Sequence, residues 1–328
     1  MIFHKDVLKI DCQKEAARIW EFIRRQAVAL RREGAVIGLS GGIDSALCAT
    51  LCVQALGRKR VFGLILPERD SSPVSKEYAA KQATELGIKT EIIDITPTLE
   101  AFGTYQKRDE MIREIFPEYD LHYRAKITLP PDLLSRDAFN FFTLTVDDSH
   151  GNIKMARLKK EKLNGIVAAT NTKLRTRMIH LYYYAENMDR FVCGTTNRTE
   201  VIQGFYVKYG DGGVDIEPIA HLYKMQVYQL SEYLGVIKEI RERTPSPDTY
   251  SFEVSDEDFY FRIPFEKLDL LLYAWENGIL ARDVCTAMGL KEDQVQRAFR
   301  DFHSKYRTTQ HLRKLPPSLL IAKPGGDP

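Results

Sequence analysis

Cysteine is scarce in this 328-residue chain, and its placement indicates neither a disulfide framework nor a zinc site. There are five, an odd number, at positions 12, 48, 52, 193 and 285, and no C-x-x-C pair occurs. Long apolar runs are also missing: none approaches the ~20 residues that span a bilayer. The first residues show no apolar signal-peptide core. These absences predict a cytoplasmic protein, in a reducing compartment, with no membrane segment.

An excess of charge of one sign is missing as well. Lys and Arg total 47 and Asp and Glu total 45, for a formal net charge of +2. Bulk charge therefore gives no indication of a nucleic-acid partner. The seven histidines form no H-E-x-x-H pair that would indicate a catalytic metal. What is present is enough apolar material, 44% of the residues, for a large core in one or two domains.

The most informative segment is S-G-G-I-D-S at residues 40–45. It follows an apolar run at 35–39 that predicts a buried strand, and it leads into a predicted helix. Such a turn directs unpaired N–H groups and the positive helix end at one point, which suits a phosphate. Asp44 would be repelled by phosphates unless a cation stood between them. The segment therefore predicts a pyrophosphate site with a built-in Mg²⁺ ligand. It is not a Walker A loop, because the G-K-[ST] ending is missing. The alternative is a glycine turn whose Ser and Asp side chains only cap the helix.

Strands and helices alternate through the first hundred residues, which predicts an α/β fold with a doubly wound parallel sheet between two layers of helices. Residues 106–164 are rich in charged and aromatic side chains and are expected to form an insertion, either a hairpin or a mobile cover, with a turn at 146–152. We predict a main domain at 1–272 and a helical extension with a Pro/Gly tail at 273–328. The expected strands lie at 35–39, 61–66, 90–95 and 191–193, and the expected helices at 11–32, 46–56, 75–86, 173–187, 223–234, 265–276 and 293–306.

A second polar segment, G-T-T-N-R-T-E at 194–200, follows the short predicted strand at 191–193. Ligand-binding turns of a parallel sheet lie at such carboxyl ends. If the two strands are neighbours, Glu200 and Asp44 face one crevice and suit a Mg²⁺ ion beside a triphosphate; on local grounds Glu200 is equally an exposed helix residue. In F-Y-V-K-Y-G-D-G-G-V-D at 205–215, Lys208 and Asp215 bracket a glycine-rich loop that either lies against a ligand or is a surface turn.

Residues 40–45 resemble the signature of the N-type ATP pyrophosphatases, which have an adenine nucleotide alpha hydrolase-like fold. Together with 194–200, 205–215, the lysine at 224 and K-L-R-T-R-M-I at 173–179, they resemble the NAD synthetase family, motif by motif and in order. The resemblance implies a C–N ligase that amidates deamido-NAD to NAD. The nicotinate carboxylate would attack the α-phosphorus of ATP, pyrophosphate would leave, and ammonia would displace AMP from the acyl-adenylate.

The resemblance also implies roles for individual residues. Asp44 and Lys224 would be catalytic, and Asp44 with Glu200 would hold Mg²⁺. Deamido-NAD would contact Arg175, Lys208, Asp215 and His311. ATP would contact Gly38, Leu39, Ser40, Gly41, Gly42, Ile43, Asp44, Ser45, Thr195, Lys224 and Ser246. We expect a homodimer without a glutaminase domain, so that the nitrogen is free ammonia or ammonia delivered by a separate subunit.

Two departures from the family's pattern keep other functions open. Residues 106–164 are longer than the connection expected there, and the C-terminal His-Lys-Arg element stands here as His311-Leu312-Arg313. The first alternative is therefore an ATP-dependent amidoligase that acts on another carboxylate. Another is tRNA thiolation or lysidine formation, which the near-neutral charge and the lack of C-x-x-C disfavour. The last is a non-catalytic nucleotide sensor, which would not need Asp44, Glu200, Lys208 and Lys224 together.

Overall fold

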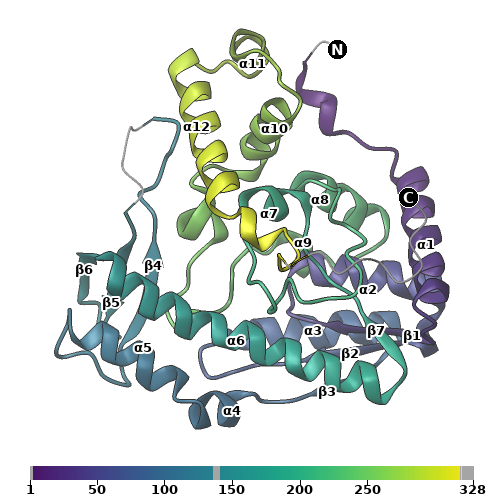
Figure 1. Cartoon of the computed structure of the whole chain (residues 1–328), viewed down its shortest axis with the longest axis horizontal. Helices are drawn as coiled ribbons and strands as arrows, with labels where there is room; N and C mark the ends of the chain where they lie inside the picture. The colour runs from purple at the N-terminus through teal and green to yellow at the C-terminus, as the bar shows by residue number, and fades with distance from the viewer. Residues whose placement is uncertain (1–2, 136–140, 318, 320–328) are drawn as a thin grey trace.

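The centre of the molecule is a four-stranded, all-parallel sheet (Figure 1). The computed structural model describes residues 3–135, 141–317 and 319. In sheet order, the strands are β3 (Lys89–Ile92), β2 (Val61–Ile65), β1 (Gly34–Gly38) and β7 (Arg190–Val192). β1 pairs in parallel with both β2 and β7. The loops after β1 and β7 therefore open side by side at the carboxyl edge of the sheet, which confirms that the two predicted strands are neighbours.

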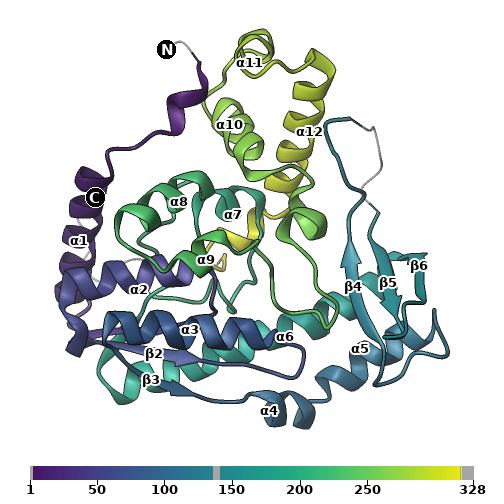
Figure 2. The same cartoon turned by 180° about the vertical axis from the view of Figure 1, so that it is seen from behind.

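Helices cover both faces of this sheet, because alternate strand residues point to opposite sides. Ala35 and Ile37 of β1 pack into one apolar cluster, and Val36 packs into another. Figures 1 and 2 show α6 on one side of the sheet and α2 and α3 on the other, so the predicted three-layer fold is confirmed. The first cluster draws on α1 (Cys12–Ala29), α2 (Ile43–Leu56), α3 (Pro73–Leu86) and α8 (Lys224–Tyr233), and the second on α4 (Thr96–Ala101), α5 (Thr104–Arg113) and α6 (Lys160–Asn187).

α6 begins at residue 160 and not at 173, where the helical pattern predicted its start. The reason is chemical, because the buried side of this helix carries polar residues. Thr170, Lys173 and Thr176 are all buried and interrupt the apolar stripe that would have indicated the longer helix.

The predicted insertion contains a second, smaller sheet between α5 and α6. It is antiparallel, in the order β4 (Arg124–Thr128), β5 (Thr143–Asp147) and β6 (Ile153–Arg157). β5 and β6 form a hairpin around the turn predicted at 146–152, where the Asp148 carboxylate accepts hydrogen bonds from the backbone of His150 and Asn152. The expectation of a hairpin is thus confirmed, and β4 adds a third strand to it. Figure 1 shows this sheet at one end of the molecule, beside the start of α6.

The C-terminal helices share their own apolar cluster, to which Phe3 and Leu8 at the other end of the chain also belong. They are α10 (Phe265–Glu276), α11 (Ala281–Met288) and α12 (Glu292–Thr308). α11 was missed, although Ala281, Val284, Cys285 and Met288 stand at helical spacing and pack into this cluster. The proposed boundary at 272/273 falls inside α10, and the division into two domains stays a prediction.

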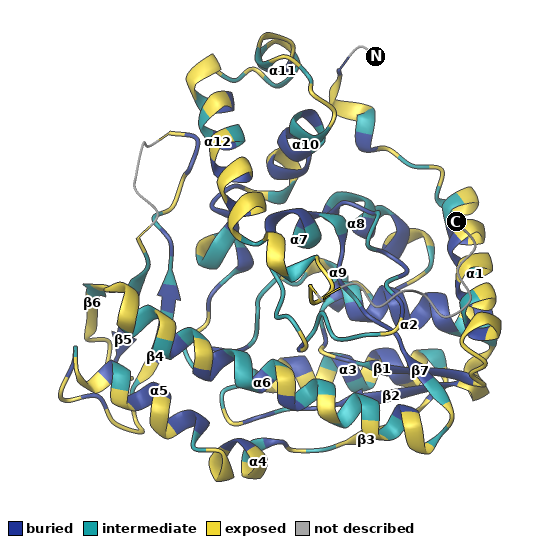
Figure 3. Ribbon diagram, in the orientation of Figure 1, coloured by how far each residue is buried: buried dark blue, intermediate teal, exposed yellow. Residues whose placement is uncertain are grey.

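Short helical segments complete the described chain. Figure 3 shows β1 and β2 largely in the buried colour and the outer helices with exposed faces. Within the ranges given above, no helix has the length and apolar character to cross a membrane. The short segments are η1 (Lys5–Leu8), η2 (Arg58–Arg60), α7 (Arg198–Gln203), α9 (Lys238–Glu242), the π-helical η3 (Glu257–Phe261) and η4 (Gln310–Leu312).

Candidate active site

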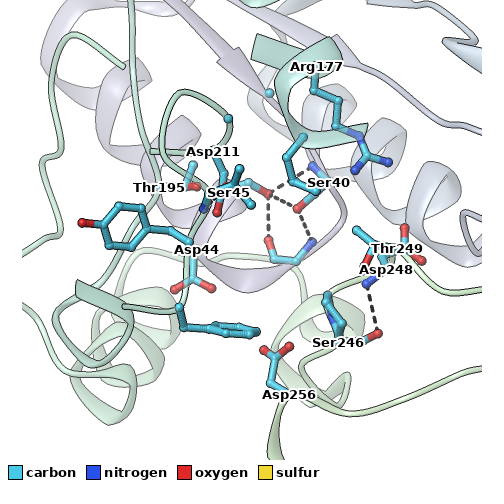
Figure 4. Close-up of a pocket in the computed structure, with 18 of the residues that line it drawn as sticks. Ser40, Asp44, Ser45, Arg177, Thr195, Asp211, Ser246, Asp248, Thr249 and Asp256 are labelled. Carbon is cyan, nitrogen blue, oxygen red and sulfur yellow. Dashed lines mark hydrogen bonds between the residues drawn. The ribbon is translucent and has the colours of Figure 1, made fainter. Parts of the chain in front are cut away.

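Residues 39–42 connect β1 to α2 in a loop that its own serine hydroxyls brace (Figure 4). The Ser40 and Ser45 hydroxyl oxygens lie 3.1 Å apart, and the Gly42 N–H donates to the Ser40 hydroxyl at 3.2 Å. Gly41 has a φ of +75°, and a Cβ there would lie 2.3 Å from the Ser75 carbonyl oxygen of α3. No side chain caps the first turn of α2. An anion therefore suits this helix end, where N–H groups and the helix dipole converge.

Asp44 lies in the first turn of α2 and is held from two directions. Its carboxylate forms an ion pair with the Lys224 ammonium at the start of α8 and accepts a hydrogen bond of 2.9 Å from the Asn197 amide. Asn197 also caps α7, where it and Glu200 each accept a hydrogen bond of 3.1 Å from the other's backbone N–H. Asn197 thus joins the loops after β1 and β7. The sequence analysis missed it, although an Asn three residues before a Glu is a capping-box signal.

Four charged side chains face one another in this place: Asp44, Glu200, Asp256 and Lys224. Burial and the nearby Asp44 charge raise the pKa of Glu200 well above its usual range. Burial, opposed by Lys224, also raises the pKa of Asp256 to about 6. Burial alone would lower the pKa of Lys224, but the three carboxylates outweigh it and raise that pKa. The group holds more negative than positive charge, and a bound cation would offset the excess.

These residues fit a Mg²⁺ ion whose coordination is completed by phosphates. Asp44 and Glu200 offer carboxylate oxygens from the first turns of α2 and α7, and the Oδ1 atom of Asp256 is buried without a hydrogen-bond partner. No three His, Cys, Asp or Glu side chains in the described part of the chain are arranged to hold a metal ion by themselves. Mg²⁺ commonly takes only one or two protein carboxylates together with substrate phosphates.

A cavity of about 600 Å³ opens beside these groups, at the carboxyl edge of the sheet. It collects most of the predicted ATP contacts in one place. Gly41 is not among its lining residues, because it lies against α3 and shapes the loop from behind. The predicted residues that line the cavity are Gly38, Leu39, Ser40, Gly42, Ile43, Asp44, Ser45, Thr195, Glu200, Lys224 and Ser246.

The four residues predicted to bind deamido-NAD do not line this cavity. Three are linked to one another: the Arg175 guanidinium donates to the Lys208 carbonyl at 3.3 Å, and the Lys208 ammonium donates to the His311 carbonyl at 2.9 Å. Asp215 is tied to β7, where it accepts a hydrogen bond of 2.7 Å from the Val192 N–H. Their role toward a ligand stays a prediction.

The cavity also contains functional groups that the sequence analysis did not assign. Arg177, quoted in the 173–179 segment but given no role, donates to the Leu66 carbonyl at 3.1 Å. Arg243 donates to the Ser75 hydroxyl at 2.9 Å. Asp248 accepts from the Ser72 N–H at 2.9 Å, and Asp256 faces Lys224 from a segment without strands. Asp256 had no sequence signal, because it stands in a run of acidic residues whose spacing gives no direction.

Comparison with known proteins agrees with this geometry. The sequence model of the family described as NAD synthase matches residues 15–128 and 139–316. This chain belongs to the NAD synthase family. The predicted resemblance is thereby confirmed, and only residues 129–138 within the matched range are left out, inside the segment predicted to be an insertion.

Two curated relatives cover this NAD synthase family member over most of its length. The NH(3)-dependent NAD(+) synthetase of Mesorhizobium japonicum is 44% identical over 322 residues, which are 98% of this chain and 100% of that protein. The protein of the same name from Thermotoga maritima is 38% identical over 287 residues, 87% of this chain and 94% of its own.

Solved structures show the same fold. An NMN synthetase from Francisella tularensis has a TM-score of 0.66 and 24% identity, over 95% of this chain and all of that one. An NH3-dependent NAD synthetase from Campylobacter jejuni has a TM-score of 0.62, also at 24% identity, over the same shares of the two chains. At 24% identity these structures establish only the fold of this chain, because one fold can carry several functions.

Proposed function

We propose that this chain makes NAD from deamido-NAD, ATP and ammonia, through an acyl-adenylate, with release of pyrophosphate and AMP. One observation carries the proposal: the segments after β1 and β7 bring a phosphate-binding turn and two carboxylates to a single cavity, where Lys224 at the start of α8 joins them. Membership of the NAD synthase family supports the choice of acid, and the names of the relatives support ammonia as the nitrogen donor.

The first half-reaction transfers the adenylyl group of ATP to the nicotinate carboxylate. A carboxylate oxygen bonds to the α-phosphorus as the bond to the β-phosphate bridging oxygen breaks, and pyrophosphate carries the electron pair away. Such transfers depend on position and charge more than on a strong base. The Ser40 and Ser45 hydroxyls and the first turn of α2 suit the departing pyrophosphate, and Lys224 supplies positive charge beside them.

Asp44 and Glu200 would hold Mg²⁺, which when bound adds positive charge against the phosphates. Asn197 fixes both carboxylates relative to each other through its hydrogen bonds. Since Lys224 already neutralises Asp44, the site can keep its shape before ATP arrives. In the second half-reaction ammonia attacks the acyl carbon, its C–N bond replaces the C–O bond to AMP, and the ammonia loses a proton.

We further propose that Arg175, Lys208, Asp215 and His311 contact deamido-NAD. The links among Arg175, Lys208 and His311 support a shared surface, since Lys208 contacts both α6 and the backbone carbonyls of residues 311 and 314. A homodimer, a cytoplasmic location and delivery of ammonia by a separate subunit likewise remain proposals from the sequence.

The direct test offers the purified protein ATP, Mg²⁺, ammonium and deamido-NAD, and follows AMP and NAD. We expect both products in equal amounts, and none when deamido-NAD is left out. AMP formation with another carboxylic acid, and none with deamido-NAD, would favour the alternative amidoligase. Glutamine in place of ammonium tests the nitrogen donor, and we expect it to give no NAD.

A further inference from the structure

The second sheet has no part in the chemistry described so far, yet one of its edges is occupied. β4 pairs with β5 on one side only. Along its other side runs the end of a segment that we name the covering loop, residues 244–256, which precedes η3 and contains no strand and no more than the first residue of a helix. A loop of this length without internal ladders depends on external partners to keep one conformation.

One backbone hydrogen bond and two hydrogen bonds that involve a side chain attach the covering loop to the free edge of β4. The Phe252 N–H donates to the Ala125 carbonyl at 3.2 Å, and the Ala125 N–H donates to the Ser251 hydroxyl at 3.0 Å. One residue further on, the Lys126 ammonium donates to the Glu253 carbonyl at 2.9 Å. An exposed sheet edge commonly binds an extended segment in this way.

Side chains strengthen the same attachment. The Phe252 ring lies 4.2 Å from the Lys126 ammonium and 5.1 Å from the centre of the Arg124 guanidinium, which indicates cation–π contacts with both. Arg124 is itself paired with Asp147 on β5. On the other side, Tyr250 and Val254 are buried in the apolar core of the second sheet. The loop thus places one aromatic ring against the cations and two apolar side chains into the core.

The first half of the covering loop is fixed to α6 and to the loop between β2 and α3 instead. The Lys173 ammonium, fully buried with Glu68 and Asp70, donates to the Thr249 carbonyl at 2.8 Å. The Asp248 carboxylate accepts from the Ser72 N–H. Between these anchors and β4, the loop lines the cavity with residues 244–250 and with Asp256.

We propose that the second sheet is a clasp that holds the covering loop against the phosphate end of the cavity before ATP binds, with Phe252 as the positioning residue. The proposal rests on the proposed function only for the identity of the nucleotide. Phe252 is not among the residues that line the cavity, so it acts through the loop that presents Ser246 and Asp256.

The test compares three variants of the full chain. Phe252→Ala removes the ring, and Phe252→Tyr keeps it. Arg157→Ala is the matched control, because Arg157 also stands over an aromatic ring, Phe141, but on β6 at the far edge of the sheet. Amide hydrogen exchange of peptides that cover residues 244–256 reports the order of the loop in the protein alone. Steady-state kinetics give the KM for ATP and for deamido-NAD.

For Phe252→Ala we expect exchange at 244–256 to be faster by about tenfold and the KM for ATP to rise by about tenfold to a hundredfold, the scale of loss when a site is misplaced. The KM for deamido-NAD should change less than about twofold. Phe252→Tyr and Arg157→Ala should match the wild type. Unchanged exchange, or faster exchange with an unchanged KM for ATP, would overturn the proposal.

Lys126→Ala keeps the test valid if Phe252→Ala does not fold. It removes a partly exposed side chain and should give the same changes in smaller measure, and no change would again overturn the clasp. If the wild type makes no NAD, the proposed function fails. The clasp is then still tested by exchange and by calorimetric binding of ATP with Mg²⁺.

Discussion

Replacement of Asp44 by Asn separates the catalytic part of the site from its contribution to stability. Asp44 pairs with Lys224, whose side chain is only 3% exposed. Loss of one partner of a buried pair costs about 3–5 kcal/mol when the remaining charge is left uncompensated. Here Glu200 and Asp256 still face Lys224, and repulsion of both by Asp44 disappears. We therefore expect a smaller loss of unfolding free energy, about 1–2 kcal/mol.

The effect on chemistry should be larger than the effect on stability. Asp44 lies within the phosphate turn at 40–45 and is one of two proposed Mg²⁺ ligands. Removal of one preorganised electrostatic group typically costs about a hundredfold to a thousandfold in rate, or about 3–4 kcal/mol. The assay is exchange of labelled pyrophosphate into ATP with deamido-NAD and Mg²⁺ but without ammonium, so that only the first half-reaction is measured.

A matched control is Asp109→Asn, which removes a buried carboxylate from an ion pair outside the cavity. Asp109 accepts from Arg108 at 2.8 Å, and both side chains are buried. This variant should lose about 1–3 kcal/mol of stability but keep the exchange rate per folded molecule within about twofold, well inside the scale of a catalytic defect. Folded Asp44→Asn protein with an exchange rate within about threefold of the wild type, against the hundredfold loss expected, would refute the assigned role.

Three further predictions follow from single features of the structure. Gly41→Ala should lower the free energy of unfolding by about 1–2 kcal/mol through its positive φ alone, and by more because its Cβ would collide with the Ser75 carbonyl; it should also raise the KM for ATP. Gly57→Ala is the control, because Gly57 has a φ of +88° but nothing lies within 4 Å of its Cβ. Urea unfolding and steady-state kinetics should show that this control loses stability only. Burial raises the pKa of Asp269 to about 7, so the folded state binds a proton that the unfolded state has lost, and stability should fall as pH rises from about 4 to about 7. In urea unfolding at a series of pH values, Asp269→Asn should reduce this loss of unfolding free energy between about pH 4 and about pH 7 by at most about 4 kcal/mol. An unchanged pH dependence would contradict the raised pKa of Asp269. Removal of Mg²⁺ with a chelator should abolish pyrophosphate exchange while leaving the unfolding midpoint of the ligand-free protein unchanged, since Lys224 already neutralises Asp44; a lowered midpoint would mean that the ion is structural.

The parts of the site that could be predicted are those whose signal is local. The phosphate turn at 40–45 carries its own strand, glycines and helix, and Glu200 follows a short strand whose neighbour was predicted correctly. Lys173 shows why other parts could not be predicted. It lies on a buried helix face and is satisfied by Glu68, Asp70 and a carbonyl from residue 249, partners that only the folded chain brings together.

The second sheet also combines a part that the sequence predicts with parts that it does not. β4 alternates between buried and less buried residues, as a half-buried strand should, whereas every residue of β6 is at least partly exposed and offers no such pattern. Asp256 reaches the cavity through the covering loop, whose path depends on Ala125 and Phe252, more than a hundred residues apart. No spacing within the sequence indicates such a contact.

The central claim is that a carboxylate of the acid attacks the α-phosphorus of ATP, and oxygen transfer tests it most directly. Deamido-NAD labelled with ¹⁸O in both nicotinate carboxylate oxygens is converted with ATP, Mg²⁺ and ammonium, and the products are weighed by mass spectrometry. The mechanism predicts one labelled oxygen in AMP and the other in the amide of NAD. Unlabelled AMP, or label in pyrophosphate or in inorganic phosphate, would contradict it.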